Sequence, residues 1–214
     1  MNILIAVPSM DSVPAVFAQS LSMLEKEGNC AVAFQVGSLV YHSRNDLAKK
    51  ALEMGADYVM WFDSDMVFEP SVMKDMLKTM RENDIDFLTG IYHRRVEPYT
   101  PTIFKKAEIF EADQVCNWQN YNDFPEDQIF EIEACGFGCV LMSTQILFDV
   151  GARYRGMFDP IGNVGEDISF CWRARQCGYE LYADPSIKLG HAAHSIITRD
   201  FYNAYKGAKG NGTN

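Results

Sequence analysis

The sequence predicts an α/β fold, with a single domain in which helices flank a mostly parallel β-sheet. Along the first 92 residues, strand-like apolar runs alternate with segments of helical periodicity. The chain has 214 residues, of which 48% are hydrophobic and 13% aromatic, which is enough to bury one large core. Helices between successive strands favour parallel pairing, and such sheets bind ligands at the carboxyl ends of their strands.

The N-terminal part of the chain predicts four strands and three helices in alternation. Each strand is a short apolar run, and each helix has apolar residues at helical spacing. Ser43 is the expected N-cap of the second helix, while Gly28 and Gly55 are expected to end the first two helices. The strands are expected at 2–7, 30–36, 57–62 and 85–92, and the helices at 13–28, 43–55 and 69–83.

The chain is less regular after residue 92. Residues 93–130 are polar and aromatic around one short strand at 102–105, and we expect them to form an insertion over the site. Residues 206–214 are expected to be a disordered tail. The elements expected between these segments are a strand, a bend, a strand and a short helix at 130–151, a helix at 165–179, and a final strand or two at 180–191.

The composition limits the class of partner. The formal net charge is −10, which disfavours a general binder of polyphosphates or anionic membranes, because such binders have basic surfaces. The first apolar run stops at Pro8 without basic residues before it, so it is read as a strand and not as a signal peptide. No segment approaches the roughly 18 apolar residues of a membrane span. Six cysteines without C-x-x-C spacing indicate free thiols and a cytoplasmic protein.

An apolar run ends in two aspartates one residue apart in the segment YVMWFDSDMVFEP, residues 58–70. Asp63 and Asp65 follow a buried strand at the point where it leaves the sheet. In extended chain, alternate side chains share a face, so we expect both carboxylates to aim at one point while Ser64 turns away. Such a pair suits a hard divalent cation. The alternative is that the two acids only terminate the strand.

A second pair of acids opens the helix predicted in GEDISFCWRARQCGY. Glu166 and Asp167 lie in its first turn, where the helix dipole favours negative charge, so one interpretation is that they only cap the helix. Adjacent helical residues diverge by about 100°, so the two side chains cannot serve one purpose. We expect Asp167 to reach into a cleft and Glu166 to be held by a neighbour. His191, at the end of an apolar strand, is a further candidate metal ligand.

These segments resemble GT-A-fold glycosyltransferases, and are similar to glycosyltransferase family two and to the Anp1-like glycosyltransferases. The resemblance rests on SRNDLAKKALEMGADYVMWFDSDM, ACGFGCVLMS, GEDISFCWRARQCGY and GH, in that order, and runs from Asn2 to about His191. It implies a Rossmann-like nucleotide-diphospho-sugar transferase domain over residues 1–205. It also implies a UDP- or GDP-sugar donor, Mn²⁺ or Mg²⁺ on the donor diphosphate, and a carboxylate beside the acceptor hydroxyl.

The resemblance assigns roles to the acids and to the histidine. Asp63, Asp65 and His191 are the expected metal ligands, with Asp65 coordinating directly and Asp63 touching the ribose or a metal-bound water. Asp167, with Glu166 beside it in the catalytic E-D pair, is the expected base for the acceptor hydroxyl. A base on the face opposite the leaving group implies inversion at the anomeric carbon, although the Anp1-like relatives retain its configuration.

Donor binding is expected at the ends of the first two strands and on the helix that follows. Arg44, taken as solvent-facing, has a planar fork that matches diphosphate oxygens, and a plain surface arginine is the alternative. Gly136 and Gly138 would let substrate approach the backbone, unless they only form a bulge. No acidic residue follows the second strand to read uracil, so the base stays open. The expected donor contacts are Pro8, Ser9, Met10, Gln35, Ser38, Arg44, Asn45, Asp63, Ser64, Gly136 and Gly138.

The acceptor stays open as a glycan, a lipid-linked glycan, a protein or a modified nucleobase. Trp118, Tyr121 and Trp172 are candidates for stacking on sugar rings, and Arg94 and Arg95 for contacts with sugar or phosphate. Two other function classes are alternatives. A sugar-nucleotide-binding protein without transfer activity would have no use for a positioned base. A nucleotidyltransferase would need a glycine-rich basic loop after the first strand, which the sequence lacks.

Overall fold

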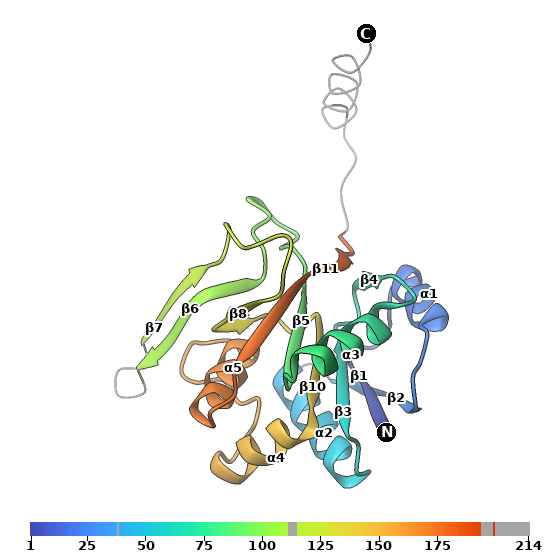
Figure 1. Ribbon diagram of the computed structural model, residues 1–214, viewed down its shortest axis with the longest axis horizontal. Helices are drawn as coiled ribbons and strands as arrows, with labels where there is room; N and C mark the ends of the chain where they lie inside the picture. Colours follow the sequence, from blue (N-terminus) through green and yellow to red (C-terminus); the bar gives the residue numbers. More distant parts are fainter. Residues whose placement is uncertain (38, 111–114, 194–198, 200–214) are drawn as a thin grey trace.

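The computed structural model describes residues 1–37, 39–110, 115–193 and 199, and it has an eight-stranded sheet with helices on both faces (Figure 1). Ser38 and the predicted tail at 206–214 lie outside these residues. The strands are β1 (Asn2–Ser9), β2 (Asn29–Val36), β3 (Tyr58–Phe62), β4 (Met66–Phe68), β5 (Phe87–Ile91), β6 (Ile103–Phe110), β7 (Val115–Asn120), β8 (Phe130–Ile132), β9 (Ala134–Cys135), β10 (Cys139–Ser143) and β11 (Leu181–His191). The helices are α1 (Ala15–Met23), α2 (Val40–Glu53), α3 (Val72–Asn83), α4 (Thr144–Arg153) and α5 (Glu166–Gln176).

The central sheet is mixed, so the prediction of a mostly parallel sheet is wrong in this respect, while the α/β class is confirmed. Its order is β2-β1-β3-β10-β5-β11-β4, with β8 paired to β11. The pairs β1/β2, β1/β3 and β5/β11 are parallel. Strand β10 is antiparallel to both β3 and β5, and β4 and β8 are antiparallel to β11. Parallel pairing needs a crossover connection, and no helix precedes β10 after the insertion.

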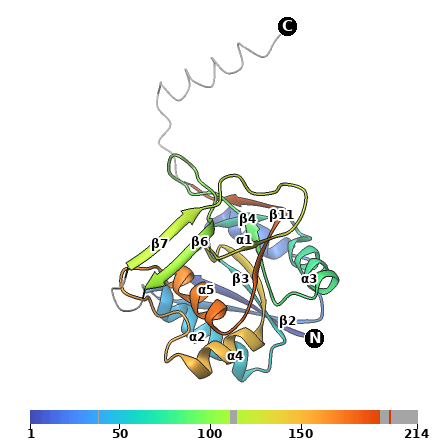
Figure 2. The same cartoon turned by 60° about the vertical axis from the view of Figure 1, so that its left-hand side comes forward.

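The helices bury apolar faces on opposite sides of the sheet, as Figures 1 and 2 show. Helices α2, α4 and α5 cover one face, with Leu47, Leu147 and Phe170 in the core. Helices α1 and α3 cover the other face. Helix α2 begins at Val40 with no side-chain cap, so the prediction of Ser43 as its N-cap is wrong, and Ser43 is buried inside the helix.

The predicted insertion contains a β-hairpin. Strand β6 begins close to the predicted short strand but extends to Phe110, and β7 pairs with it antiparallel. Strand β9 pairs with the other edge of β6, which gives a separate three-stranded sheet. Figure 2 shows the hairpin standing beside α5. The insertion therefore brings a second sheet to the side of the molecule where α5 begins.

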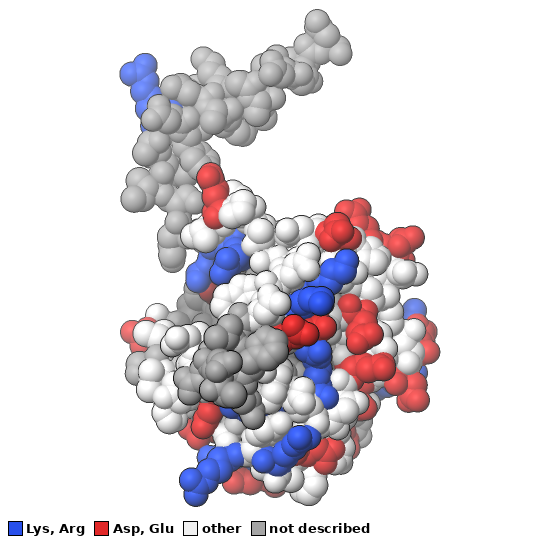
Figure 3. All heavy atoms as spheres, turned by 90° about the vertical axis from the view of Figure 1, so that its left-hand side faces the viewer, with Lys and Arg blue, Asp and Glu red and all other residues white. Residues whose placement is uncertain are grey.

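The surface charge is not segregated by sign on the face shown in Figure 3, where acidic and basic side chains are interspersed. This agrees with an acidic chain that keeps local basic positions. None of the helices in the described residues is long and apolar enough to cross a membrane.

Candidate active site

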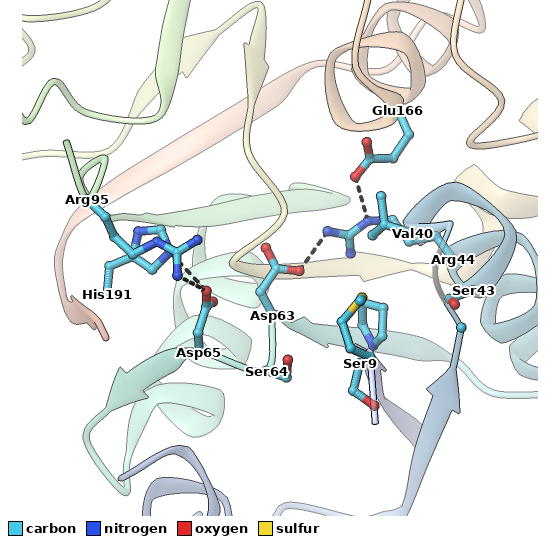
Figure 4. A pocket seen from close by; sticks show the side chains of 13 residues that line it. Ser9, Val40, Ser43, Arg44, Asp63, Ser64, Asp65, Arg95, Glu166 and His191 are labelled. Atoms are coloured by element: carbon cyan, nitrogen blue, oxygen red, sulfur yellow. Dashed lines mark hydrogen bonds and ion pairs between the residues drawn. The ribbon is translucent and has the colours of Figure 1, made fainter. Parts of the chain in front are cut away.

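A cavity of ≈ 300 Å³, called here the first cavity, lies where β1 and β3 end and α2 begins. Its walls include the turn after β3, the end of β11 and the first residue of α5 (Figure 4). The structure thus gathers residues from distant parts of the sequence at the carboxyl ends of parallel strands, as such folds do. The sequence-predicted residues that line it are Pro8, Ser9, Met10, Arg44, Asp63, Ser64, Asp65, Arg95, Glu166 and His191.

The two aspartates after β3 point apart, which corrects the expectation that they share one target. The chain there is a turn and not extended, because the amide of Met66 donates to the carbonyl of Asp63 (3.1 Å). Asp63 Oδ1 accepts from Arg44 Nη2 at 2.7 Å. Asp65 Oδ2 lies 2.9 Å from Arg95 Nη1 and 3.4 Å from His191 Nε2. Figure 4 shows the two carboxylates turned to opposite walls of the cavity.

Arg44 is a buried cation, so its expected solvent-facing position is wrong. Its side chain is 2% exposed and pairs with Asp63 and, through Nε at 3.3 Å, with Glu166 Oε1. The guanidinium lies 5.1 Å from the ring centroid of Phe137. Burial lowers the pKa of Arg44, but the charges of Asp63 and Glu166 outweigh burial, and the net pKa is raised. Arg44 therefore links α2, the turn after β3 and the start of α5.

One polar atom of Arg44 is unsatisfied. Its Nη1 is buried and has no hydrogen-bond partner among the described residues. Buried polar groups are normally paired, and an orphan donor at the wall of a cavity is a place where a ligand acceptor fits.

His191 reaches Asp65 through strand pairing. Strand β11 pairs with β4 so that His191 lies opposite Met66, and the amide of Ala192 donates to the carbonyl of Asp65 (2.8 Å). The ring Nδ1 donates to the carbonyl of His93 at 2.9 Å, which leaves Nε2 to face Asp65. The hydrogen bond to Asp65 raises the pKa of His191. Burial raises the pKa of Asp65, but His191 and Arg95 outweigh burial, and the net pKa is lowered.

Asp65 and His191 fit a divalent cation that takes its other ligands from outside the protein. One carboxylate oxygen and one imidazole nitrogen converge, and the carbonyl of His93 orients the ring as such partners do at metal sites. Within the described ranges no cluster of three or more His, Cys, Asp or Glu side chains has metal-binding geometry. Asp63, expected as a third ligand, is instead held by Arg44.

Glu166 and Asp167 serve different cavities. Glu166 lines the first cavity and pairs with Arg44. Asp167 lines another cavity, of ≈ 380 Å³, called here the second cavity. Its Oδ1 accepts from the amide of Ile168 at 2.8 Å, so the capping interpretation also holds in part. Burial, followed by the charge of Glu166, raises the pKa of Asp167 to about 6.

The second cavity lies between β5, the β6–β7 hairpin and the start of α5. Trp118, one of the stacking candidates, lines it, as does Arg94. Tyr92, Thr102 and Asn120 also line it, and no motif in the sequence predicts them as site residues. Long-range contacts bring them together: the amide of Thr102 donates to the carbonyl of Tyr92 (3.0 Å), and Asn120 of β7 pairs with Phe104 of β6.

Gly136 and Gly138 make room for the side chain of Tyr92. A Cβ on Gly136 would lie 2.3 Å from the Tyr92 hydroxyl oxygen, and one on Gly138 would lie 2.6 Å from Tyr92 Cζ. The amide of Gly138 donates to that hydroxyl at 3.2 Å, and its carbonyl accepts from the amide of Asp63 at 3.1 Å. The glycines thus position the turn after β3. Neither lines the first cavity, but Gly136 lines the second, and their role in substrate access stays a prediction.

Two more expected donor contacts lie outside the first cavity. Asn45 is buried, donates from Nδ2 to Asp159 (2.7 Å) and accepts from the amide of Phe158 (3.0 Å), so it holds the segment before α5. Gln35 donates to Asp46 at 3.5 Å. Neither Asn45 nor Gln35 lines the first cavity, and their contact with a donor stays a prediction.

No protein-family model matches the sequence, and no curated protein matches it. Among solved structures, A197 from STIV is 19% identical, with a TM-score of 0.59, and the match covers 92% of this chain and 97% of that one. GalNAc-T7, in a structure with UDP, GalNAc and Mn²⁺, is 10% identical with a TM-score of 0.62. That match covers 91% of this chain and 43% of GalNAc-T7, so this chain corresponds to less than half of it. At these identities the similarity establishes architecture: the protein is a mixed α/β domain with a GT-A fold.

Proposed function

We propose that the protein is a metal-dependent glycosyltransferase that moves a sugar from a UDP- or GDP-sugar to an acceptor hydroxyl. The observation that supports this most is that consecutive acids at the start of α5 line two different cavities. A transferase needs a donor site and an acceptor site that meet at the reacting carbon, with a base on the acceptor side. A protein that only binds sugar nucleotides needs the first cavity alone.

The first cavity suits the diphosphate of a donor. Arg44 offers the orphan Nη1, and Arg95 supplies a second guanidinium beside Asp65. Guanidinium groups form charge-assisted hydrogen bonds with phosphate oxygens. Pro8, Ser9 and Met10, at the end of β1, are assigned to the nucleoside. The UDP in the GalNAc-T7 structure supports a UDP-sugar, and GDP-sugars are the second set of donors to test.

Asp65 and His191 would hold Mn²⁺ or Mg²⁺ on that diphosphate. A cation bound there would stabilise, as a Lewis acid, the negative charge that develops on the leaving diphosphate. The Mn²⁺ in the GalNAc-T7 structure supports this assignment. Asp63, turned to Arg44, is assigned to the ribose or to a metal-bound water.

Asp167 is assigned as the base. A pKa of about 6 leaves its carboxylate ionised at neutral pH and suited to accept a proton. The acceptor oxygen forms a bond to the anomeric carbon and gives its proton to Asp167. The bond from that carbon to the phosphate oxygen breaks, and the nucleoside diphosphate leaves with the electron pair. We assign inversion, because base and leaving group belong to different cavities.

Incubation with UDP- and GDP-sugars and Mn²⁺ tests this function. We expect release of nucleoside diphosphate, with a glycoside of inverted configuration in the product NMR spectrum when an acceptor is present. If the nucleotide sugar binds and no nucleoside diphosphate is released, the protein is a sugar-nucleotide-binding protein without transfer activity. Release of monophosphate or pyrophosphate would indicate nucleotidyl transfer. A retained configuration would overturn the assignment of inversion.

Removal of the cation or of its ligands is expected to weaken nucleotide binding. Asp65→Ala, His191→Ala and chelation of the wild-type protein should each lower UDP affinity in calorimetry by roughly tenfold or more. Glu82→Ala is the control, because Glu82 is an exposed carboxylate on α3 outside both cavities. Equal UDP affinity with and without Mn²⁺ would contradict the metal assignment.

A further inference from the structure

Several groups that line the second cavity have no partner within the described part of the chain. The indole of Trp118 is 51% exposed and makes neither a hydrogen bond nor a ring contact there. The guanidinium of Arg94 likewise has no hydrogen bond or ion pair with the described residues. Asn120 donates from Nδ2 to the carbonyl of Pro101 (3.2 Å), which leaves its Oδ1 available. The cavity therefore presents an aromatic face, a donor and an acceptor to whatever binds beside Asp167.

Trp118 is exposed and makes no ring contact with the residues that the structure describes, unlike the other two tryptophans. Trp61 is fully buried and packs against Phe137 and Phe158 in the core. Trp172 lies against Tyr154, with ring centroids 6.2 Å apart, and does not line the second cavity. The exposed indole lines a polar cavity and so presents a flat apolar face beside hydrogen-bonding groups, which suits a ligand that has an apolar face of its own.

The polar groups narrow the ligand class. A lipid chain would need an apolar cavity, whereas Arg94, Asn120 and Asp167 place donors and acceptors around this one. A sugar ring combines an apolar face of C–H groups with a rim of hydroxyls, and it matches both the indole and the polar groups. The volume of ≈ 380 Å³ falls within the range of small-molecule sites, about 300–1,000 Å³.

We propose that the second cavity binds a sugar ring of a glycan acceptor, with its apolar face on Trp118 and its attacking hydroxyl toward Asp167. Arg94 and Asn120 Oδ1 contact the other hydroxyls. This inference rests on the proposed function, because it names the acceptor for the same base. The β6–β7 hairpin is thereby the element that selects the acceptor.

Methyl glycosides of glucose, galactose, mannose and N-acetylglucosamine are the probes that test it. Saturation-transfer NMR with the full chain, UDP and Mn²⁺ is expected to detect binding of at least one of them. Trp118→Ala should weaken that binding about tenfold, while Trp118→Phe retains most of it, because an aromatic face remains. Trp172→Ala is the matched control and should leave glycoside binding unchanged.

The outcomes separate this inference from the proposed function. UDP and Mn²⁺ affinity should be the same in Trp118→Ala as in the wild type, because Trp118 does not line the first cavity. If UDP binds with Mn²⁺ but no glycoside binds, or if Trp118→Ala binds glycosides as the wild type does, the acceptor assignment is overturned and the transferase proposal stands. If UDP does not bind at all, the proposed function itself fails. Thermal unfolding of each variant establishes that it is folded.

Discussion

Asp167→Asn is expected to lower kcat by roughly 10²–10⁴-fold while nucleotide and Mn²⁺ affinity stay at the wild-type level. An amide keeps the shape of the carboxyl group but cannot accept the acceptor proton. Asp167 lines the second cavity, whereas the groups assigned to nucleotide and cation line the first, so binding and turnover should separate. Steady-state kinetics with saturating donor, together with calorimetry of UDP binding, measures the two effects.

Asp84→Asn is the matched control for Asp167→Asn. Asp84 is the exposed C-cap of α3 with φ of 53°, a conformation that asparagine also tolerates, so the same chemical change should leave kcat unchanged. Wild-type turnover in Asp167→Asn would return the E-D pair to the role of a helix cap.

The pH dependence gives a second measurement of the same group. With saturating donor and Mn²⁺, kcat should rise with pH and level off above about 6, because only ionised Asp167 accepts a proton. The contribution of Asp167 to folding stability changes with pH in the opposite direction. Between the ordinary pKa of 3.8 and about 6, the folded protein keeps a proton that the unfolded chain has lost, so stability falls as pH rises through this window. Asp167→Asn should remove the rise of kcat with pH and the contribution of Asp167 to the pH dependence of stability.

The local elements of the fold were predictable because each carries its own periodicity. The apolar run before Asp63 is β3, and the helix that opens on Glu166 is α5, as expected. The antiparallel orientation of β10 in the sheet was not predictable, because it depends on the path that the insertion before it takes. Strand β4 was also missed: its three residues precede Glu69 and Pro70, which read as the start of a helix.

The chemical types at the candidate site were predictable, but the geometry was not. Asp65 and His191 were each predictable as metal ligands from their places at strand ends, but their contact depends on the pairing of β11 with β4. The divergence of Asp63 from Asp65 depends on a turn that an alternation rule for strands cannot foresee. The packing role of Gly136 and Gly138 was not predictable, because Tyr92, the side chain that requires them, is distant in sequence.

The burial of Arg44 was the largest difference, since arginine near the start of a helix is usually exposed. Its position follows from two acids that arrive from other elements, Asp63 after β3 and Glu166 in α5. Neither pairing leaves a signal in the sequence around residue 44. The same burial makes this residue the strongest candidate for a test of stability.

Arg44→Ala is expected to lower the free energy of unfolding by about 3 kcal/mol, near the lower end of the cost of breaking a buried ion pair. The substitution leaves Asp63 and Glu166 without their cation and opens a void beside Phe137. The cost stays near the lower end because the two acids keep 31% and 17% of their side-chain surface exposed, so water solvates them in part. For a chain of this size, thermal unfolding should shift down by roughly 6–12 °C.

Two further variants separate the causes of that loss. Arg81→Ala removes an exposed arginine whose partner is Glu27, and it should change stability by less than about 1 kcal/mol. Arg44→Met keeps most of the side-chain volume without the charge, so it should recover the part of the loss that comes from the void and leave the part that comes from the two unpaired acids. If Arg44→Ala unfolds at the same temperature as Arg81→Ala, the buried ion pair contributes nothing to stability.

UDP affinity in Arg44→Met measures the role of Arg44 in binding the diphosphate. This variant lacks the orphan Nη1 assigned to the diphosphate, while the metal ligands Asp65 and His191 are untouched.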